Sequence, residues 1–112
     1  MRLPNADQAR VDREKITDYL LSTTHPRGRS KAEFFIRFGF RAEGWEMLAD
    51  ALRNHAVSYP VARTVSSPYG VRYTVDGPIE TPDGRNPRVR TVWMIDEGST
   101  TPRLLTALQV RR

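Results

Sequence analysis

One segment of the sequence combines an imidazole with several cations. His25 lies in the polar run Ser22–Arg29 close to Arg27 and Arg29, and Lys31 follows two residues later. A histidine in such a place can act as a general acid or base. Together with the free N–H groups of a helix start, the cations can bind a phosphate. An exposed loop histidine and a solvated basic surface explain the same residues, and the sequence leaves these alternatives open.

A second set of residues combines hydroxyl groups with aromatic rings. Tyr69-Gly70 forms part of a turn, and Thr91 and Trp93 are two apart on a candidate strand. Such groups can stack on bases and bond to phosphate or ribose. Alternation places Thr91 and Trp93 on one side of the strand and Arg90 on the other. Because alternation does not tell which side faces the helices, Trp93 is equally well explained as a core residue.

Other kinds of site are excluded or have no support in the sequence. The chain has no cysteine, which excludes a thiol nucleophile, a thiolate zinc site and an iron–sulfur cluster. Two distant histidines and scattered acidic residues suggest no metal site, so we expect no metal and no cofactor. His55, at the end of a predicted helix, is expected to interact with that helix's C-terminus. No Ser-His-Asp arrangement, P-loop or dinucleotide motif occurs.

Composition indicates a small basic protein. The 112 residues include 18 basic and 13 acidic side chains, a net charge of +5, which favours an anionic partner. Only two of the basic residues are lysines, and an arginine bias fits either phosphate binding or a high-GC genome. The length suggests one domain spanning residues 1–112. With no apolar run of membrane-spanning length and no signal peptide, we expect a cytoplasmic location.

The elements that position these residues follow from the hydrophobic period. It is helical before Tyr59-Pro60 and alternating afterwards. Helices are predicted at 12–21, 30–38 (with a capping box from Ser30 to Glu33) and 42–56, and strands at 61–65, 71–79, 89–96 and 103–110. The pattern predicts an α+β fold with N-terminal helices packed on a C-terminal four-stranded antiparallel sheet, the first strand at an edge.

Five blocks in a fixed order extend over nearly the whole chain. They are Lys15-Ile16-x-x-Tyr19-Leu20-Leu21, His25-Pro26-x-Gly28-x-x-Lys31-Ala32-x-Phe34-Phe35, Tyr69-Gly70-x-x-Tyr73-x-Val75, Thr91-Val92-Trp93 and Pro102-Arg103-Leu104-Leu105-Thr106. With the opening Met1-Arg2-Leu3-Pro4-Asn5-Ala6, the sequence resembles the domain-of-unknown-function family 6883.

The resemblance implies a ribonuclease toxin. Members of that family occur as small bacterial proteins, often encoded beside a small partner, and as the C-terminal tips of polymorphic and contact-dependent toxins. Related tips have the barnase/EndoU/colicin/RelE type of fold and cleave RNA without a metal. For this chain the resemblance implies a metal-independent ribonuclease acting on tRNA or mRNA, with a small acidic antitoxin or immunity protein as partner and no membrane association.

Within this interpretation each candidate residue receives a role. We expect His25 to be the acid or base, Lys31 and Arg103 to stabilise phosphate charge, and Tyr69 and Thr91 to supply hydroxyl hydrogen bonds. The expected substrate-binding residues are Arg27, Arg29, Arg90, Trp93 and Thr106. Five residues are expected to converge on one concave face: His25, Lys31, Thr91, Trp93 and Arg103. If Thr91 and Trp93 instead face the helices, Arg90 marks the functional face.

A rival interpretation needs no catalysis. The same arginines would serve a nucleic-acid-binding or protein-binding chain of the antitoxin or immunity type. Such proteins are more often acidic, against a basic toxin.

Overall fold

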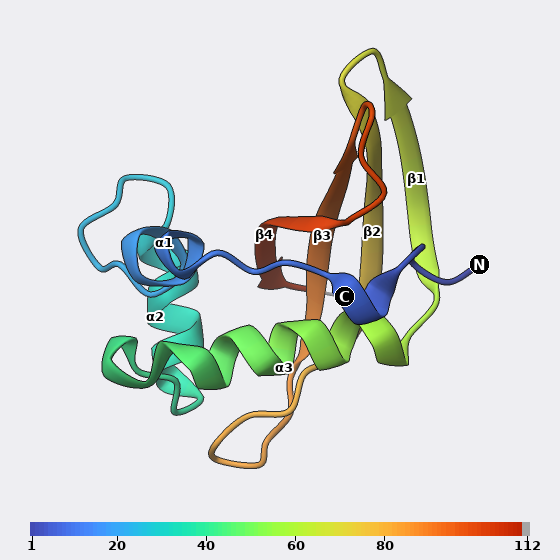
Figure 1. Cartoon of the computed structure of the whole chain (residues 1–112). Coiled ribbons are helices and arrows are strands. Elements are labelled where there is room, and N and C mark those ends of the chain that lie inside the picture. Colours follow the sequence, from blue (N-terminus) through green and yellow to red (C-terminus); the bar gives the residue numbers. More distant parts are fainter. Residues whose placement is uncertain (111–112) are drawn as a thin grey trace.

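The computed structural model describes residues 1–110 and consists of helices followed by a sheet (Figure 1). The helical elements are η1 (Ala6–Gln8), α1 (Arg13–Lys15), η2 (Ile16–Leu20), α2 (Arg29–Arg37), η3 (Ala42–Gly44) and α3 (Trp45–Ser58). The strands are β1 (Val61–Ser67), β2 (Gly70–Pro78), β3 (Arg88–Asp96) and β4 (Arg103–Gln109). The predicted α+β fold is confirmed, and the change from helix to sheet falls at Tyr59-Pro60 as expected.

Two of the helices differ in detail from the sequence prediction. The predicted helix 12–21 begins as α1 and continues in η2 as a wider π-turn, in which the Leu21 N–H donates to the Ile16 carbonyl at 2.7 Å. The capping box predicted from Ser30 to Glu33 is wrong, because α2 begins at Arg29 and no side chain caps it. Glu33 instead pairs with Arg29 one helical turn away.

The sheet is an antiparallel meander in the order β1-β2-β3-β4, with β1 at one edge as predicted. The register between β3 and β4 shifts after Val92, so that Trp93 pairs with Leu104 while Thr91 pairs with Ala107. This bulge allows Leu104 and Ala107 both to face inward although they are three residues apart.

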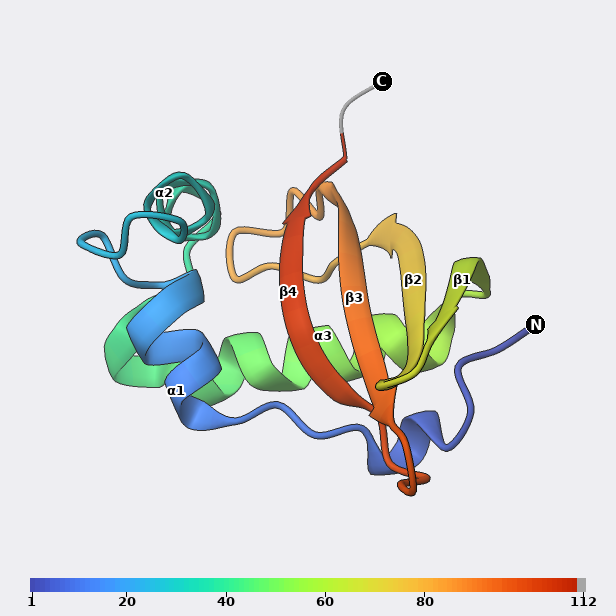
Figure 2. The same ribbon diagram turned by 90° about the horizontal axis from the view of Figure 1, so that it is seen from above.

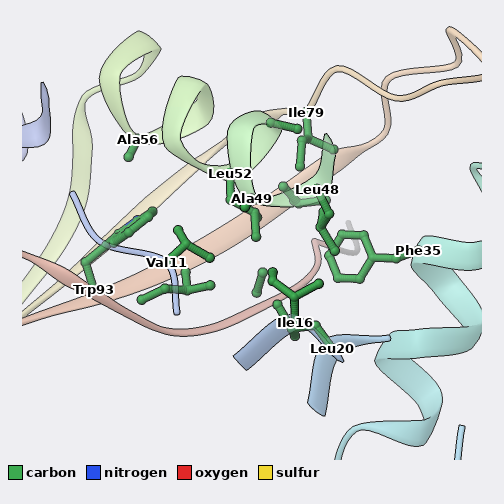
Figure 3. Close-up of a cluster of buried hydrophobic side chains, with 14 of the residues drawn as sticks. Val11, Ile16, Leu20, Phe35, Leu48, Ala49, Leu52, Ala56, Ile79 and Trp93 are labelled. Carbon is green, nitrogen blue, oxygen red and sulfur yellow. The ribbon is translucent and has the colours of Figure 1, made fainter. Parts of the chain in front are cut away.

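The helices cover one face of the sheet and one edge. Figure 2 shows α3 running across that face, with α1 and α2 beside β4. One hydrophobic cluster fills the space between them, and Figure 3 shows Phe35 and Trp93 at opposite ends of the part drawn, with Leu48 and Leu52 between them. No helix of residues 1–110 covers the other face, which we call the open face.

The orientation of β3 decides which residues are buried. Thr91 and Trp93 face α3 and are fully buried, whereas Arg90 lies exposed on the open face. The predictions that Trp93 stacks a base and that Thr91 contacts a substrate are therefore wrong, since neither side chain reaches the surface. Trp93 is a core residue.

His55 links α3 to the sheet through a chain of buried hydrogen bonds. Its Nε2 lies 2.9 Å from the Gly77 carbonyl oxygen and 3.2 Å from that of Val89. Because carbonyl oxygens only accept, Nε2 carries the proton. Nδ1 then accepts from the Thr91 hydroxyl at 3.0 Å, and that oxygen accepts from the Trp93 indole N–H at 2.8 Å. The prediction that His55 serves its own helix end is wrong, because its ring points into the core.

Replacing Thr91 with valine should destabilise the fold. The change keeps the shape but leaves the Trp93 N–H without an acceptor and His55 Nδ1 without a donor, which should lower the free energy of unfolding by about 1–3 kcal/mol. Chemical denaturation measures this. Thr64→Val on exposed β1 is the control and should stay within about 0.5 kcal/mol. Equal effects of the two changes would show that the buried hydroxyl is not needed.

Stability should also depend on pH through His55. Burial lowers its pKa below 6.5, and the hydrogen bonds to Gly77 and Val89 offset only part of this. Below about pH 6.5 the unfolded chain binds a proton at His55 that the folded chain does not bind, so the free energy of unfolding falls as pH falls. The slope should approach about 1.4 kcal/mol per pH unit. Denaturation between pH 5 and 8 should show a shallower slope for His55→Gln, and an unchanged slope would contradict this account.

Candidate active site

Tyr19 lies where η2, α2 and β4 meet. Its hydroxyl is 2.9 Å from the Thr106 hydroxyl of β4, and either atom can be the donor. Ile16 and Leu20 of the same helix are buried in the core and anchor η2. The Tyr19 ring is therefore held at the margin of the core, half-buried, with its polar end at the edge of the sheet.

The chain's only two lysines converge on this ring. Lys15 lies four residues before Tyr19, and Lys31 comes from the first turn of α2. Each Nζ lies 5.5 Å from the centroid of the ring, within the range of a cation–π contact. Two of the protein's positive charges are thus concentrated around one phenol.

These neighbours change the acidity of the phenol. Partial burial raises the pKa of Tyr19, but the hydrogen bond with Thr106 and the contacts and positive charges of Lys31 and Lys15 outweigh it, so the pKa lies below its ordinary value of 10. The surroundings therefore favour the phenolate more than water does.

His25 packs against the same ring. The two ring centroids are 5.1 Å apart in an edge-to-face arrangement. Its Nδ1 accepts the backbone N–H groups of Arg27 and Gly28, both at 3.0 Å. With its Nδ1 lone pair engaged, the neutral imidazole carries its proton on Nε2. In this conformation His25 offers a hydrogen-bond donor and holds the loop that leads into α2.

Gly28 allows that loop to close on the helix. A Cβ atom at this position would collide with the backbone carbonyl of Tyr19 and would lie 3.0 Å from its ring. The glycine therefore lets two backbones meet that any larger residue would separate. As a result, both His25, which precedes Gly28 in the chain, and Lys31, which follows it, reach the Tyr19 ring.

Charged residues border an open hollow in front of the ring. It is lined by Asp12, Glu14, Lys15, Asp18, Tyr19 and His25. A second hollow, which Lys31 also borders, is lined by Ser30, Lys31, Phe34, Leu108 and Gln109. Lys31 and Tyr19 thus lie between a helical surface and the edge strand of the sheet.

The other predicted cations lie elsewhere or are already paired. Arg90 makes a bidentate ion pair with Asp76 on the open face, at 2.8 and 3.0 Å. Arg103, at the start of β4, makes another with Asp96 at 2.7 and 3.0 Å. Each pair lowers the pKa of its aspartate. Neither arginine meets the Tyr19 ring, so the expected convergence extends to His25 and Lys31 but not to Arg103.

Three of the remaining predicted residues are exposed, namely Arg27, Arg29 and Tyr69. Arg27 and Arg29 flank Gly28, and Arg29 pairs with Glu33 at 3.3 Å. Tyr69 is 78% exposed in the turn between β1 and β2, away from α1 and α2 (Figure 1). Thr106, expected to bind substrate, is half-buried and is the hydrogen-bond partner of Tyr19.

Sequence reasoning assigned no role to Tyr19 and Lys15. Their i,i+4 spacing on a predicted helix indicates that a cation lies beside a phenol. Both residues also occur in the first of the five blocks. The spacing does not reveal the contact between Lys31 and Tyr19, because that contact depends on the loop that Gly28 closes.

No group of three histidine, aspartate or glutamate side chains within residues 1–110 could hold a metal ion. None of the helices formed by these residues has the length and apolar character needed to cross a membrane.

The fold, helices packed on a four-stranded antiparallel meander, also occurs in a solved bacterial structure. The chain is similar to one chain of a contact-dependent growth inhibition toxin–immunity protein complex from Klebsiella pneumoniae 342. The TM-score is 0.70 at 18% identity, over 89% of this chain and 98% of that chain, so the likeness concerns the fold. No curated protein matches in sequence. The chain belongs to the DUF6883 family, a domain of unknown function, with a match over residues 2–111.

Replacing Gly28 with alanine should displace the loop. The added methyl group has to push against the Tyr19 backbone, and overpacking of this kind costs about 1–3 kcal/mol. The control is Gly44→Ala, where a Cβ meets no atom within 4 Å. Thermal denaturation and the NMR signals of the His25 ring report the effect. Equal stability and unchanged His25 signals in both variants would mean that the loop does not depend on this close approach.

Proposed function

We propose that this protein is a metal-independent ribonuclease of a bacterial toxin–immunity or toxin–antitoxin system. The observation that carries the proposal is the cluster around Tyr19, in which both lysines, a histidine and a threonine meet at a phenol whose pKa is lowered. The shared fold with a chain of a toxin–immunity complex supports the biological setting.

RNA cleavage suits the groups that this site offers. The 2′-hydroxyl of RNA supplies the nucleophile, so the protein needs no nucleophile of its own. It has to donate a proton to the leaving 5′-oxygen and stabilise the charge of the phosphorane. Lys31 and Lys15 supply positive charge, and the Nε2–H of His25 supplies a hydrogen bond. The available groups therefore match a reaction that proceeds without a metal.

A non-catalytic partner protein would leave the cluster unexplained. Such a protein needs a surface of suitable charge and shape. It does not need two lysines and an imidazole grouped around one phenol ring. The open face with Arg90 and Arg103 suits binding of either kind and does not separate the two functions. The Tyr19 cluster is therefore the basis of the choice, and the net charge of +5 fits an acidic inhibitor protein as partner.

Purified protein should cleave RNA in the presence of EDTA. Lys31→Gln should reduce the rate by about 10²-fold or more, because the phosphorane loses a nearby cation. Gel analysis of bacterial RNA measures cleavage, and growth after induction reports toxicity. Arg41→Gln is the control, since it removes a positive charge from an exposed site at the start of η3.

Three results would contradict the proposal. They are RNA left intact by the folded wild-type protein, cleavage only after addition of a divalent ion, and equal losses in the Lys31 and Arg41 variants. The last would show that net charge, and not the position of Lys31, determines the effect.

A further inference from the structure

We infer that Tyr19 is the general acid of the cleavage reaction, giving its phenolic proton to the leaving 5′-oxygen. This inference rests on the proposed function and names the residue that performs its proton transfer. The phenol carries a transferable proton, and the groups around it stabilise the negative charge that remains when the proton leaves.

The geometry leaves His25 a different role. To act as an acid–base catalyst through Nε2, the ring would have to take up a second proton on Nδ1. That nitrogen accepts two backbone N–H groups, from Arg27 and Gly28, and protonation would turn both contacts into repulsion between donors. His25 therefore transfers no proton: it holds the Gly28 loop beside the Tyr19 ring and offers its Nε2–H only as a hydrogen-bond donor.

Every element packed around Tyr19 contributes to its chemistry. Lys15 approaches from α1 and Lys31 from α2, while Thr106 of β4 binds the hydroxyl. Three acidic residues border the same hollow, Asp12, Glu14 and Asp18. Asp12 is paired with Arg10 at 3.2 Å, and Asp18 accepts a hydrogen bond from Thr17. The net effect of these neighbours is a pKa below that of free tyrosine.

The reaction step balances around this residue. The 2′-hydroxyl loses its proton to water as its oxygen forms a bond to phosphorus. The bond from phosphorus to the 5′-oxygen breaks, and that oxygen takes the proton of Tyr19. The products are a 2′,3′-cyclic phosphate and a free 5′-hydroxyl. The resulting phenolate is stabilised by Lys15, Lys31 and the Thr106 hydroxyl, and it regains a proton from water once the products leave.

Changing the leaving group tests this role directly. The substrate is an RNA cleaved by the wild-type protein, made with either oxygen or sulfur at the bridging 5′-position of the cleaved bond. A thiolate leaves without protonation, so it does not need a general acid. We expect Tyr19→Phe to slow cleavage of the oxygen substrate by about 10²-fold or more and that of the sulfur substrate by less than about 10-fold.

The outcomes separate the possible explanations. Equal losses on both substrates would overturn the role of Tyr19 as an acid and show a structural role, while the proposed ribonuclease function would stand. A wild-type protein that cleaves no RNA would remove the proposed function and this role together. Tyr59→Phe, which removes a phenolic hydroxyl from a half-buried residue outside the cluster, is the control and should leave both rates unchanged.

A titration independent of RNA tests the basis of the inference. Four tyrosines are present, and absorbance at 295 nm follows their ionisation. In the wild-type protein one of them should ionise below pH 10. That transition should vanish in Tyr19→Phe and move to higher pH in Lys31→Gln. Its persistence in Tyr19→Phe would overturn the inference even if the protein cleaves RNA.

Discussion

The buried hydrogen-bond chain from Trp93 through Thr91 to His55 fixes how the sheet faces the helices. All of its polar atoms are paired, and none of the buried side-chain polar atoms in the described part of the chain lacks a partner. Turning β3 over would expose the Trp93 ring and bury Arg90. Because unpaired polar groups and charges are costly to bury, this arrangement permits one face of the sheet inside and the other outside.

The position of the candidate site follows from that constraint. Once Thr91 and Trp93 face inward, their partners Ala107 and Leu104 must do so too, and the bulge in β4 makes this possible. Thr106 lies between these two buried residues, at the edge nearest η2, where it meets the Tyr19 hydroxyl. The core of the protein thus determines the location of the phenol, and the Tyr19 ring packs against the margin of that core.

The fold was predictable from the sequence because its signals are local. The change of hydrophobic period at Tyr59-Pro60 separated helices from strands, and tight turns allowed only a meander. The strand that contains Thr91 and Trp93 was also found, but not its orientation. Alternation is symmetric, and the choice of face depends on His55, which lies 36 residues from Thr91 along the chain.

The candidate site was only partly predictable for the same reason. His25 and Lys31 were found because they lie close together in the sequence beside a glycine. Arg103 resembled a phosphate ligand until its pairing with Asp96 was known, and such a pairing depends on how two strands align. In the sequence Tyr19 cannot be distinguished from a core residue, because its polar neighbours belong to three elements that meet only in the folded chain.

The most direct measurement is the structure of the protein with an RNA that lacks the 2′-hydroxyl at the cleaved position. Such an RNA binds as a substrate but cannot react. The account predicts the 5′-oxygen of the cleaved bond within about 3 Å of the Tyr19 hydroxyl oxygen, with Lys31 Nζ beside the same phosphate. A phosphate chain bound only along Arg90 and Arg103 of the open face, with Tyr19 and Lys31 free of contact, would contradict it.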